Sequence, residues 1–151
     1  MTQAIAVHPT RALVAKWGTV AAAAAAALVT VGSYGNDKQW SAVPFLIGLV
    51  VIVSAVVFGL VVPRALHAVE TGAPSAARWT VGHGIATVLL LTVFWSGAEL
   101  IVGTAAIVLA IVGRRRAAGS ERVYRATIWL AGTAMTLSVV WTVLNAVAFG
   151  N

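Results

Sequence analysis

The chain has 151 residues, of which 60% are hydrophobic and only 9% are charged, with a net charge of +6. Soluble domains carry about 25% charged residues, and a chain of this size leaves much of its surface exposed, so a soluble globular fold is excluded. The lack of cysteine excludes disulfides, thiolate catalysis and cysteine-ligated metals. We expect a small all-α, polytopic membrane protein that forms a single integral domain over residues 1–151, with a composition typical of a GC-rich bacterial genome.

Three apolar runs are each long enough to cross a ~30 Å hydrocarbon core, for which ~20 helical residues suffice. They cover residues 13–32, 43–62 and 126–149. Between the first two, residues 33–41 are rich in Gly, Asn and Asp, which predicts a turn. Pro44 fits the first helical turn of the second run. The polar segment 63–78 predicts a connection that can open with a short helical extension.

A further apolar stretch, residues 79–113, has 35 residues and holds a single charge, Glu99. One helix of that length would measure ~52 Å, which is more than tilt can comfortably absorb. A tight turn at the Ser96-Gly97 pair divides the stretch into two short helices that form a hairpin. The resulting spans are residues 79–95 and 99–113, so we expect five spans in all.

The positions of the basic residues and of tryptophan favour five spans with a cytoplasmic N-terminus and an outside C-terminus. Nine of the ten Lys and Arg residues then lie inside and only Lys38 lies outside, as the positive-inside rule requires. With the exception of Trp141, the tryptophans fall at span ends, where headgroups favour them: Trp17, Trp40, Trp79, Trp95 and Trp129. The alternative is a cleaved N-terminal signal peptide, which would leave four spans.

Glu99 and His83 are the candidate functional polar residues. A carboxylate inside a bilayer usually marks an ion path or a proton relay. The five-span topology instead favours Glu99 in the outer turn, wetted by headgroups, where the dipole of the fourth helix stabilises it. His83 can titrate near neutral pH, but an interfacial or helix-contact histidine bonded to a neighbour is the simpler interpretation. On a straight helix the two residues lie ~24 Å apart, so we do not expect them to be direct partners.

The loop before the last span is basic, and its arginines set the orientation and can contact anionic lipid headgroups. They are Arg114, Arg115, Arg116, Arg122 and Arg125. His67 and Glu70 would share a helical face. A metal site would need further ligands with organised spacing, so we expect a solvent-exposed ion pair there, and no metal or cofactor.

Small residues recur along the spans and favour close helix packing, either within the bundle or in a homo-oligomer, with Gly82, Gly84 and Gly103 as test positions. The chain has none of the motifs of serine hydrolases, zinc proteases or P-loop proteins. We therefore expect a non-enzymatic packing or accessory subunit of the inner membrane, with lipid and a membrane partner as its contacts and no nucleic acid. The alternative is a small proton-coupled transporter or channel that uses Glu99 or His83, and a lipid-modifying enzyme ranks third.

Overall fold

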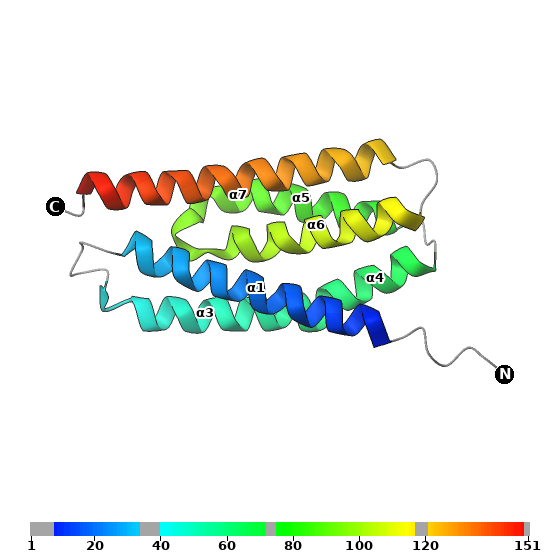
Figure 1. Cartoon of the computed structure of the whole chain (residues 1–151), viewed down its shortest axis with the longest axis horizontal. Helices are drawn as coiled ribbons and strands as arrows, with labels where there is room; N and C mark the ends of the chain where they lie inside the picture. Colours follow the sequence, from blue (N-terminus) through cyan, green and yellow to red (C-terminus); the bar gives the residue numbers. More distant parts are fainter. Residues whose placement is uncertain (1–7, 34–39, 72–74, 117–120, 150–151) are drawn as a thin grey trace.

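The computed structural model describes residues 8–33, 40–71, 75–116 and 121–149. Almost all of these residues are helical, and no strand occurs among them. In chain order the elements are α1 (His8–Gly32), α3 (Val43–Val56), the π-helix η1 (Val57–Val61), α4 (Val62–Glu70), α5 (Ala76–Leu90), the 3-10 helix η2 (Leu91–Ser96), α6 (Ala98–Arg116) and α7 (Glu121–Phe149). The helices run side by side along one long axis (Figure 1), which confirms the all-α bundle.

Within the described part of the chain, three helices are long and apolar enough to cross a membrane. They are Ala12–Gly32, Val43–Glu70 and Glu121–Ala148. These helices contain the first, second and last predicted spans, and they indicate a membrane protein. The second exceeds its predicted length because α3 continues through η1 into α4, which confirms the short helical extension after residue 62. The π-helix ends two residues before Pro63, which has no N–H to offer the regular helical ladder.

The predicted break in the long apolar stretch is also confirmed. After η2, Gly97 turns the chain into α6 with a φ of +68°, a backbone conformation that glycine adopts without steric cost. The helices α5 and α6 then pack against each other as an antiparallel hairpin (Figure 1). Neither arm is among the three candidate spans, because α5 has only 15 residues and α6 carries a glutamate at one end and arginines at the other.

The helix α6 lies at the centre of the bundle, where it contacts α1, α4, α5 and α7. Its buried residues occupy several faces: Leu100, Ile101, Ala105, Ala106, Val108, Leu109 and Ala110. The alanines let neighbouring helices approach closely. In Figure 1, α1 and α3 lie on one side of α6, and α5 and α7 lie on the other.

The structure separates glycines that pack inside the bundle from those that do not. A Cβ at Gly84 would lie 3.0 Å from Cγ2 of Thr127, and a Cβ at Gly103 would lie 2.6 Å from Sδ of Met135. Close packing at these two positions is therefore confirmed. The prediction of packing within the bundle is wrong for Gly82, because a Cβ there would meet nothing within 4 Å, and packing in a homo-oligomer stays a prediction there. Residues two apart in a helix point about 200° from each other, so Gly82 faces outward when Gly84 faces the core.

Candidate functional site

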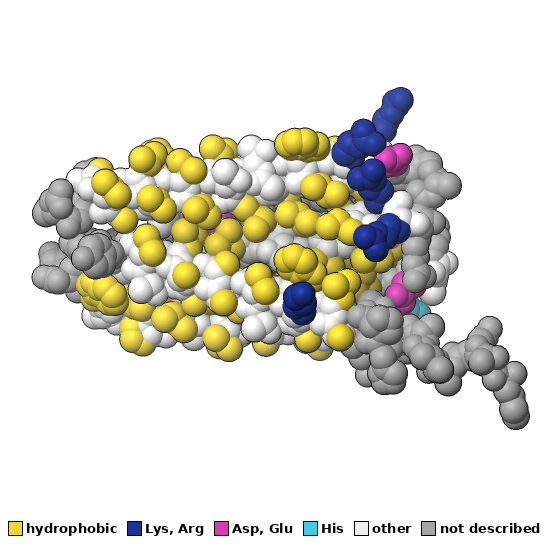
Figure 2. Space-filling model, viewed as in Figure 1, with side chains coloured by type: hydrophobic (Ala, Val, Ile, Leu, Met, Phe, Trp, Pro, Cys, Tyr) yellow, Lys and Arg dark blue, Asp and Glu magenta, His cyan; other side chains and the backbone are white. Residues whose placement is uncertain are grey.

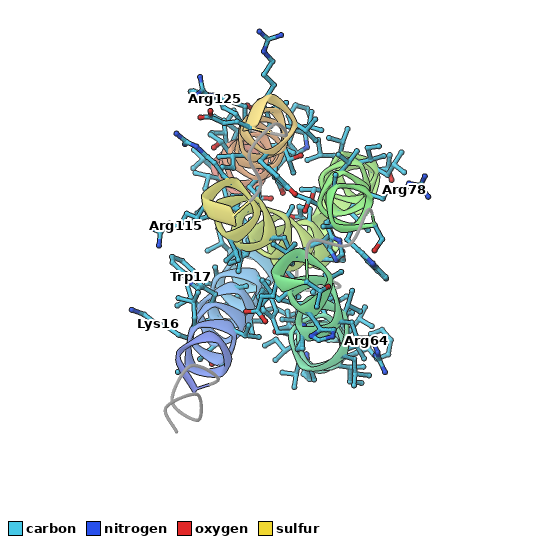
Figure 3. The ribbon with its side chains drawn as sticks, turned by 90° about the vertical axis from the view of Figure 1, so that its right-hand side faces the viewer. Lys16, Trp17, Arg64, Arg78, Arg115 and Arg125 are labelled. Carbon is cyan, nitrogen blue, oxygen red and sulfur yellow. The ribbon has the colours of Figure 1, made fainter. Side chains whose placement is uncertain are left out.

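On the face of the bundle that Figure 2 shows, the Lys and Arg side chains lie toward one end. We call the described Lys and Arg residues the basic collar. They are Lys16, Arg64, Arg78, Arg114, Arg115, Arg122 and Arg125. Figure 3 views the bundle from this end and shows the labelled members pointing outward from different helices. The side chains of Arg11 and Arg116, and all of Lys38, lie outside the described residues.

Two arginines of the predicted basic loop are held by Glu121. The Arg125 guanidinium donates to Glu121 Oε1 at 2.8 Å, and Arg114 Nε lies 3.2 Å from the same oxygen. About half of each side chain is exposed, so these pairs stabilise the fold only slightly. Arg115 and Arg122 form no ion pair within the described part of the chain, so their predicted contacts with lipid stay a prediction.

Exposed tryptophans accompany the collar. Trp17 and Trp79 directly follow basic residues of α1 and α5, and Trp129 lies one turn beyond Arg125 on α7. Two other exposed tryptophans lie away from the collar: Trp40, just before α3, and Trp141, far along α7. The side chain of Trp95 is outside the described residues. This distribution is typical of two headgroup levels separated by an apolar zone.

Glu99 lies in the first turn of α6, as predicted, but the expectation that headgroups wet its carboxylate is wrong. The side chain is 0% exposed, and the hydroxyl of the buried Ser138 on α7 donates to its Oε1 at 2.6 Å. The hairpin tip does not project from the bundle, because α1 and α7 both extend past it (Figure 1). A Cβ at Gly97 would lie 3.0 Å from the carbonyl oxygen of Ala25, so the tip packs directly on α1.

The carboxyl group also lies well inside the bundle along its axis. At 1.5 Å per residue, Glu99 is ~22 Å from Arg114 along α6, and Ser138 is ~20 Å from Arg125 along α7. Both paths therefore place the site about 20 Å from Arg114 and Arg125 of the basic collar. Beyond Ser138, α7 continues to Phe149, a further ~16 Å at the same rise.

Glu99 has no compensating charge in the part of the chain that the structure describes. Within the described residues, no Lys, Arg or His forms an ion pair with it. The nearest titratable groups on the helices packed around it all lie toward the collar: Lys16 on α1, His83 on α5, Arg114 on α6 and Arg125 on α7. Burial of a carboxyl group without a countercharge is costly, and such a group inside a membrane protein is a candidate functional site.

Two oxygens of this site are buried without a hydrogen-bond partner among the described residues: Oε2 of Glu99 and Oγ1 of Thr142. Thr142 lies one turn beyond Ser138 on α7, on the same face, and is 3% exposed. Leaving such groups unsatisfied typically costs 1–3 kcal/mol each. We call these three residues the Glu99 site: Glu99 and Ser138 are joined by a hydrogen bond, and Thr142 follows one turn further along α7.

His83 lies elsewhere in the bundle. Its Nδ1 is 2.7 Å from the carbonyl oxygen of Trp79, and its ring tilts against the Trp79 ring with 6.3 Å between centroids. It follows Arg78 by five residues, so it lies only ~7 Å from the collar along α5. The structure therefore does not bring His83 and Glu99 together, and the hydrogen bond of His83 is made within its own helix.

His67 and Glu70 lie exposed on α4, whose other face is buried through Val62, Ala65, Leu66 and Val69. The predicted sharing of one helical face is therefore confirmed. No group of three or more His, Cys, Asp and Glu side chains that could hold a metal occurs among the described residues.

Sequence reasoning missed Ser138 and Thr142 as partners of Glu99. The sequence did contain a sign of this site, because Ser138 and Thr142 are two hydroxyl residues four apart in an apolar span and so share a helical face. Polar side chains in a span usually face the interior of the bundle. What could not be read from the chain is that this face meets the hairpin tip, since Ser138 and Glu99 are 39 residues apart.

Comparisons of the chain with protein-family models, with curated proteins and with solved structures produced no significant match. The Glu99 site is therefore interpreted through its own geometry and chemistry.

Proposed function

We propose that the chain is a five-span protein of the bacterial cell membrane, with its N-terminus in the cytoplasm and its C-terminus outside. The basic collar supports this orientation, because it lies at the end where α1 and α7 begin, while α7 ends at the other (Figures 1 and 2). The short hairpin arms supply the third and fourth crossings, with α6 shielded from lipid by its neighbours. Arg115 and Arg122 of the collar bind anionic lipid headgroups on the inner face.

Cysteine labelling tests this topology, because the chain contains no native cysteine. Asn36→Cys and Gly119→Cys would be treated in intact cells with a membrane-impermeant maleimide. We expect labelling at position 36 in intact cells, and at position 119 only after the membrane is permeabilised. Labelling of both positions in intact cells would contradict the odd number of crossings between them.

We further propose that Glu99 binds and releases a proton, and that the protein acts as a small, non-enzymatic, proton-coupled transporter or channel. The supporting observation is the burial of Glu99 without a countercharge. If the collar marks the inner boundary of a ~30 Å hydrocarbon core, the ~20 Å to the site leaves Glu99 about 10 Å inside the outer boundary. A carboxyl group at such a depth usually marks an ion or proton pathway.

Infrared difference spectroscopy of the protein in lipid nanodiscs tests the proton-binding role directly. A pH step should produce a carboxylic C=O band that disappears in Glu99→Gln. The matched control is Glu121→Gln, which removes an exposed carboxylate and should leave that band in place. A spectrum without any band sensitive to Glu99→Gln would contradict the proposal.

Proton movement can be measured in vesicles that enclose a pH-sensitive dye, with a potassium diffusion potential as the driving force. For a channel we expect faster proton entry with the wild-type protein than with Glu99→Gln. A different outcome is that protons enter vesicles with either protein no faster than vesicles without protein, while the infrared band is present. That result would favour a carrier that moves protons only together with a substrate over a channel.

The second candidate is the packing or accessory subunit, and outward-facing glycines favour it. A Cβ at Gly48, Gly59 or Gly132 would meet nothing within 4 Å, and the exposed Thr136 lies one turn beyond Gly132. Small residues on an outer face allow another helix to approach. On this interpretation Gly132→Leu would abolish association with a partner or a second copy, whereas Glu99→Gln would be tolerated.

A further inference from the structure

We propose that a water molecule bound between Glu99 and Thr142 connects Glu99 to the end of the bundle opposite the basic collar. The proton of Glu99 would then be exchanged from that side only. This inference rests on the proposed function of Glu99 as a proton-binding group, and it adds the direction of access and the residue that provides it.

The first supporting observation is the pair of buried oxygens without partners, Glu99 Oε2 and Thr142 Oγ1. Ser138 links the two residues, because its hydroxyl is bonded to Oε1 of Glu99 and Thr142 follows it by one turn, ~6 Å along the axis of α7. Ordered water usually satisfies buried polar groups that lack a protein partner. One water can join two oxygens that are about 5–6 Å apart through two hydrogen bonds of normal length.

The second observation is that the bundle ends close to Thr142. Its Cγ2 would lie 3.1 Å from a Cβ at Gly32, which is the last residue of α1. The next residue, Ser33, is also buried, but its hydroxyl is bonded to the carbonyl oxygen of Val29 at 2.9 Å, so of these two side chains only Thr142 has an unpartnered hydroxyl. Only about 10 Å of α7 remain between Thr142 and Phe149, so the route outward is short.

The third observation is that the bundle is closed on the collar side of Glu99. A Cβ at Gly103 would lie 2.6 Å from Sδ of Met135, and one at Gly113 would lie 2.5 Å from the ring of Tyr124. Side chains of α7 therefore fill the space beside α6 at these two levels and leave no room for a water molecule there.

The hydroxyl groups on the collar side are also already used within their own helices. Thr87 donates to the carbonyl oxygen of His83 at 2.8 Å, and Thr127 donates to that of Val123 at 3.0 Å. A proton relay needs groups that can accept and donate in turn, and Thr142 alone among these three threonines has an unpartnered hydroxyl. The polar route therefore runs outward through Thr142.

The test compares Thr142→Val with Thr127→Val in nanodiscs, where both faces of the membrane meet the buffer. Both changes replace a buried hydroxyl with a methyl group of similar size. The readout is the rate at which the Glu99 carboxylic band shifts after transfer into D₂O. We expect Thr142→Val to slow this exchange about tenfold, which corresponds to about 1.4 kcal/mol of barrier, and Thr127→Val to leave it unchanged.

A third variant separates loss of the hydroxyl from a packing defect. Thr142→Ser keeps the hydroxyl and should exchange at the wild-type rate, and the unfolding midpoint of each variant should stay near that of the wild type. The outward route would be overturned if Thr127→Val slowed the exchange, or if neither valine variant slowed it. Either result would leave Glu99 as a proton-binding group. The absence of any band sensitive to Glu99→Gln would overturn the proposed function and this inference together.

Discussion

The contrast between Gly82 and Gly84 provides the sharpest test of how α5 packs. The two glycines are separated by one residue, yet a Cβ at Gly84 would lie 3.0 Å from Thr127 Cγ2, whereas at Gly82 it would meet nothing within 4 Å. Thr127 cannot easily move aside, because its side chain is branched at Cβ and its hydroxyl is bonded to the carbonyl oxygen of Val123. A larger side chain at position 84 must therefore push α5 away from α7.

The expected magnitude follows from these contacts. Leucine adds three carbon atoms beyond a Cβ that is already too close, so Gly84→Leu should lower the free energy of unfolding by about 3 kcal/mol, the upper end of typical overpacking costs. A leucine at position 82 points away from the core, and it removes the unfavourable helix propensity of glycine. Gly82→Leu should therefore raise the free energy of unfolding by less than about 1 kcal/mol. The two variants should therefore differ by roughly 3–4 kcal/mol.

Unfolding in mixed micelles with increasing SDS, followed by tryptophan fluorescence, would measure this difference. The six native tryptophans supply the signal, and purified wild-type protein supplies the reference. Equal stability of the two leucine variants, within about 0.5 kcal/mol as expected for neutral surface changes, would refute the contact between α5 and α7 at position 84.

Three further predictions use the same unfolding assay. Gly97→Ala should destabilise the bundle by at least about 1 kcal/mol, because alanine disfavours a positive φ and its Cβ would lie 3.0 Å from the carbonyl oxygen of Ala25. If this variant were as stable as the wild type, the hairpin tip would not pack on α1. Ser138→Ala should cost about 1–3 kcal/mol because it removes the hydrogen-bond donor of Glu99 Oε1. No loss of stability would argue against the Glu99–Ser138 hydrogen bond. Glu121→Gln should leave the unfolding midpoint unchanged at physiological salt, because the ion pairs of Glu121 are half exposed. A large decrease would mean that these ion pairs stabilise the bundle.

Much of the fold could be predicted because the relevant forces act locally along the chain. Apolar length predicts a membrane helix, since lipid cannot hydrogen-bond a bare backbone. The break at Ser96-Gly97 was predictable because glycine alone adopts a positive φ at little cost, and Gly97 has such a φ. The gathering of arginines at one end followed from counting charges on each side of the spans.

The prediction for Glu99 failed because it treated a turn between spans as a surface. Whether a turn reaches water depends on how far the neighbouring helices extend past it, and this is a property of the assembled bundle. Here α1 and α7 both continue beyond the hairpin tip (Figure 1). The prediction for Gly82 failed for a related reason, because spacing alone does not say which face of α5 meets a neighbour.

The sequence by itself therefore determined that this is a helical membrane protein with a hairpin turn at Gly97 and a basic end, because composition, helix length and backbone preference are properties of short segments. Only the tertiary structure decided that Glu99 is buried and bonded to Ser138, that Thr142 is buried one turn further along α7, and that Gly84 rather than Gly82 faces the core. These features depend on the offset and rotation of helices that are far apart in the chain, which are settled by side-chain packing across the bundle.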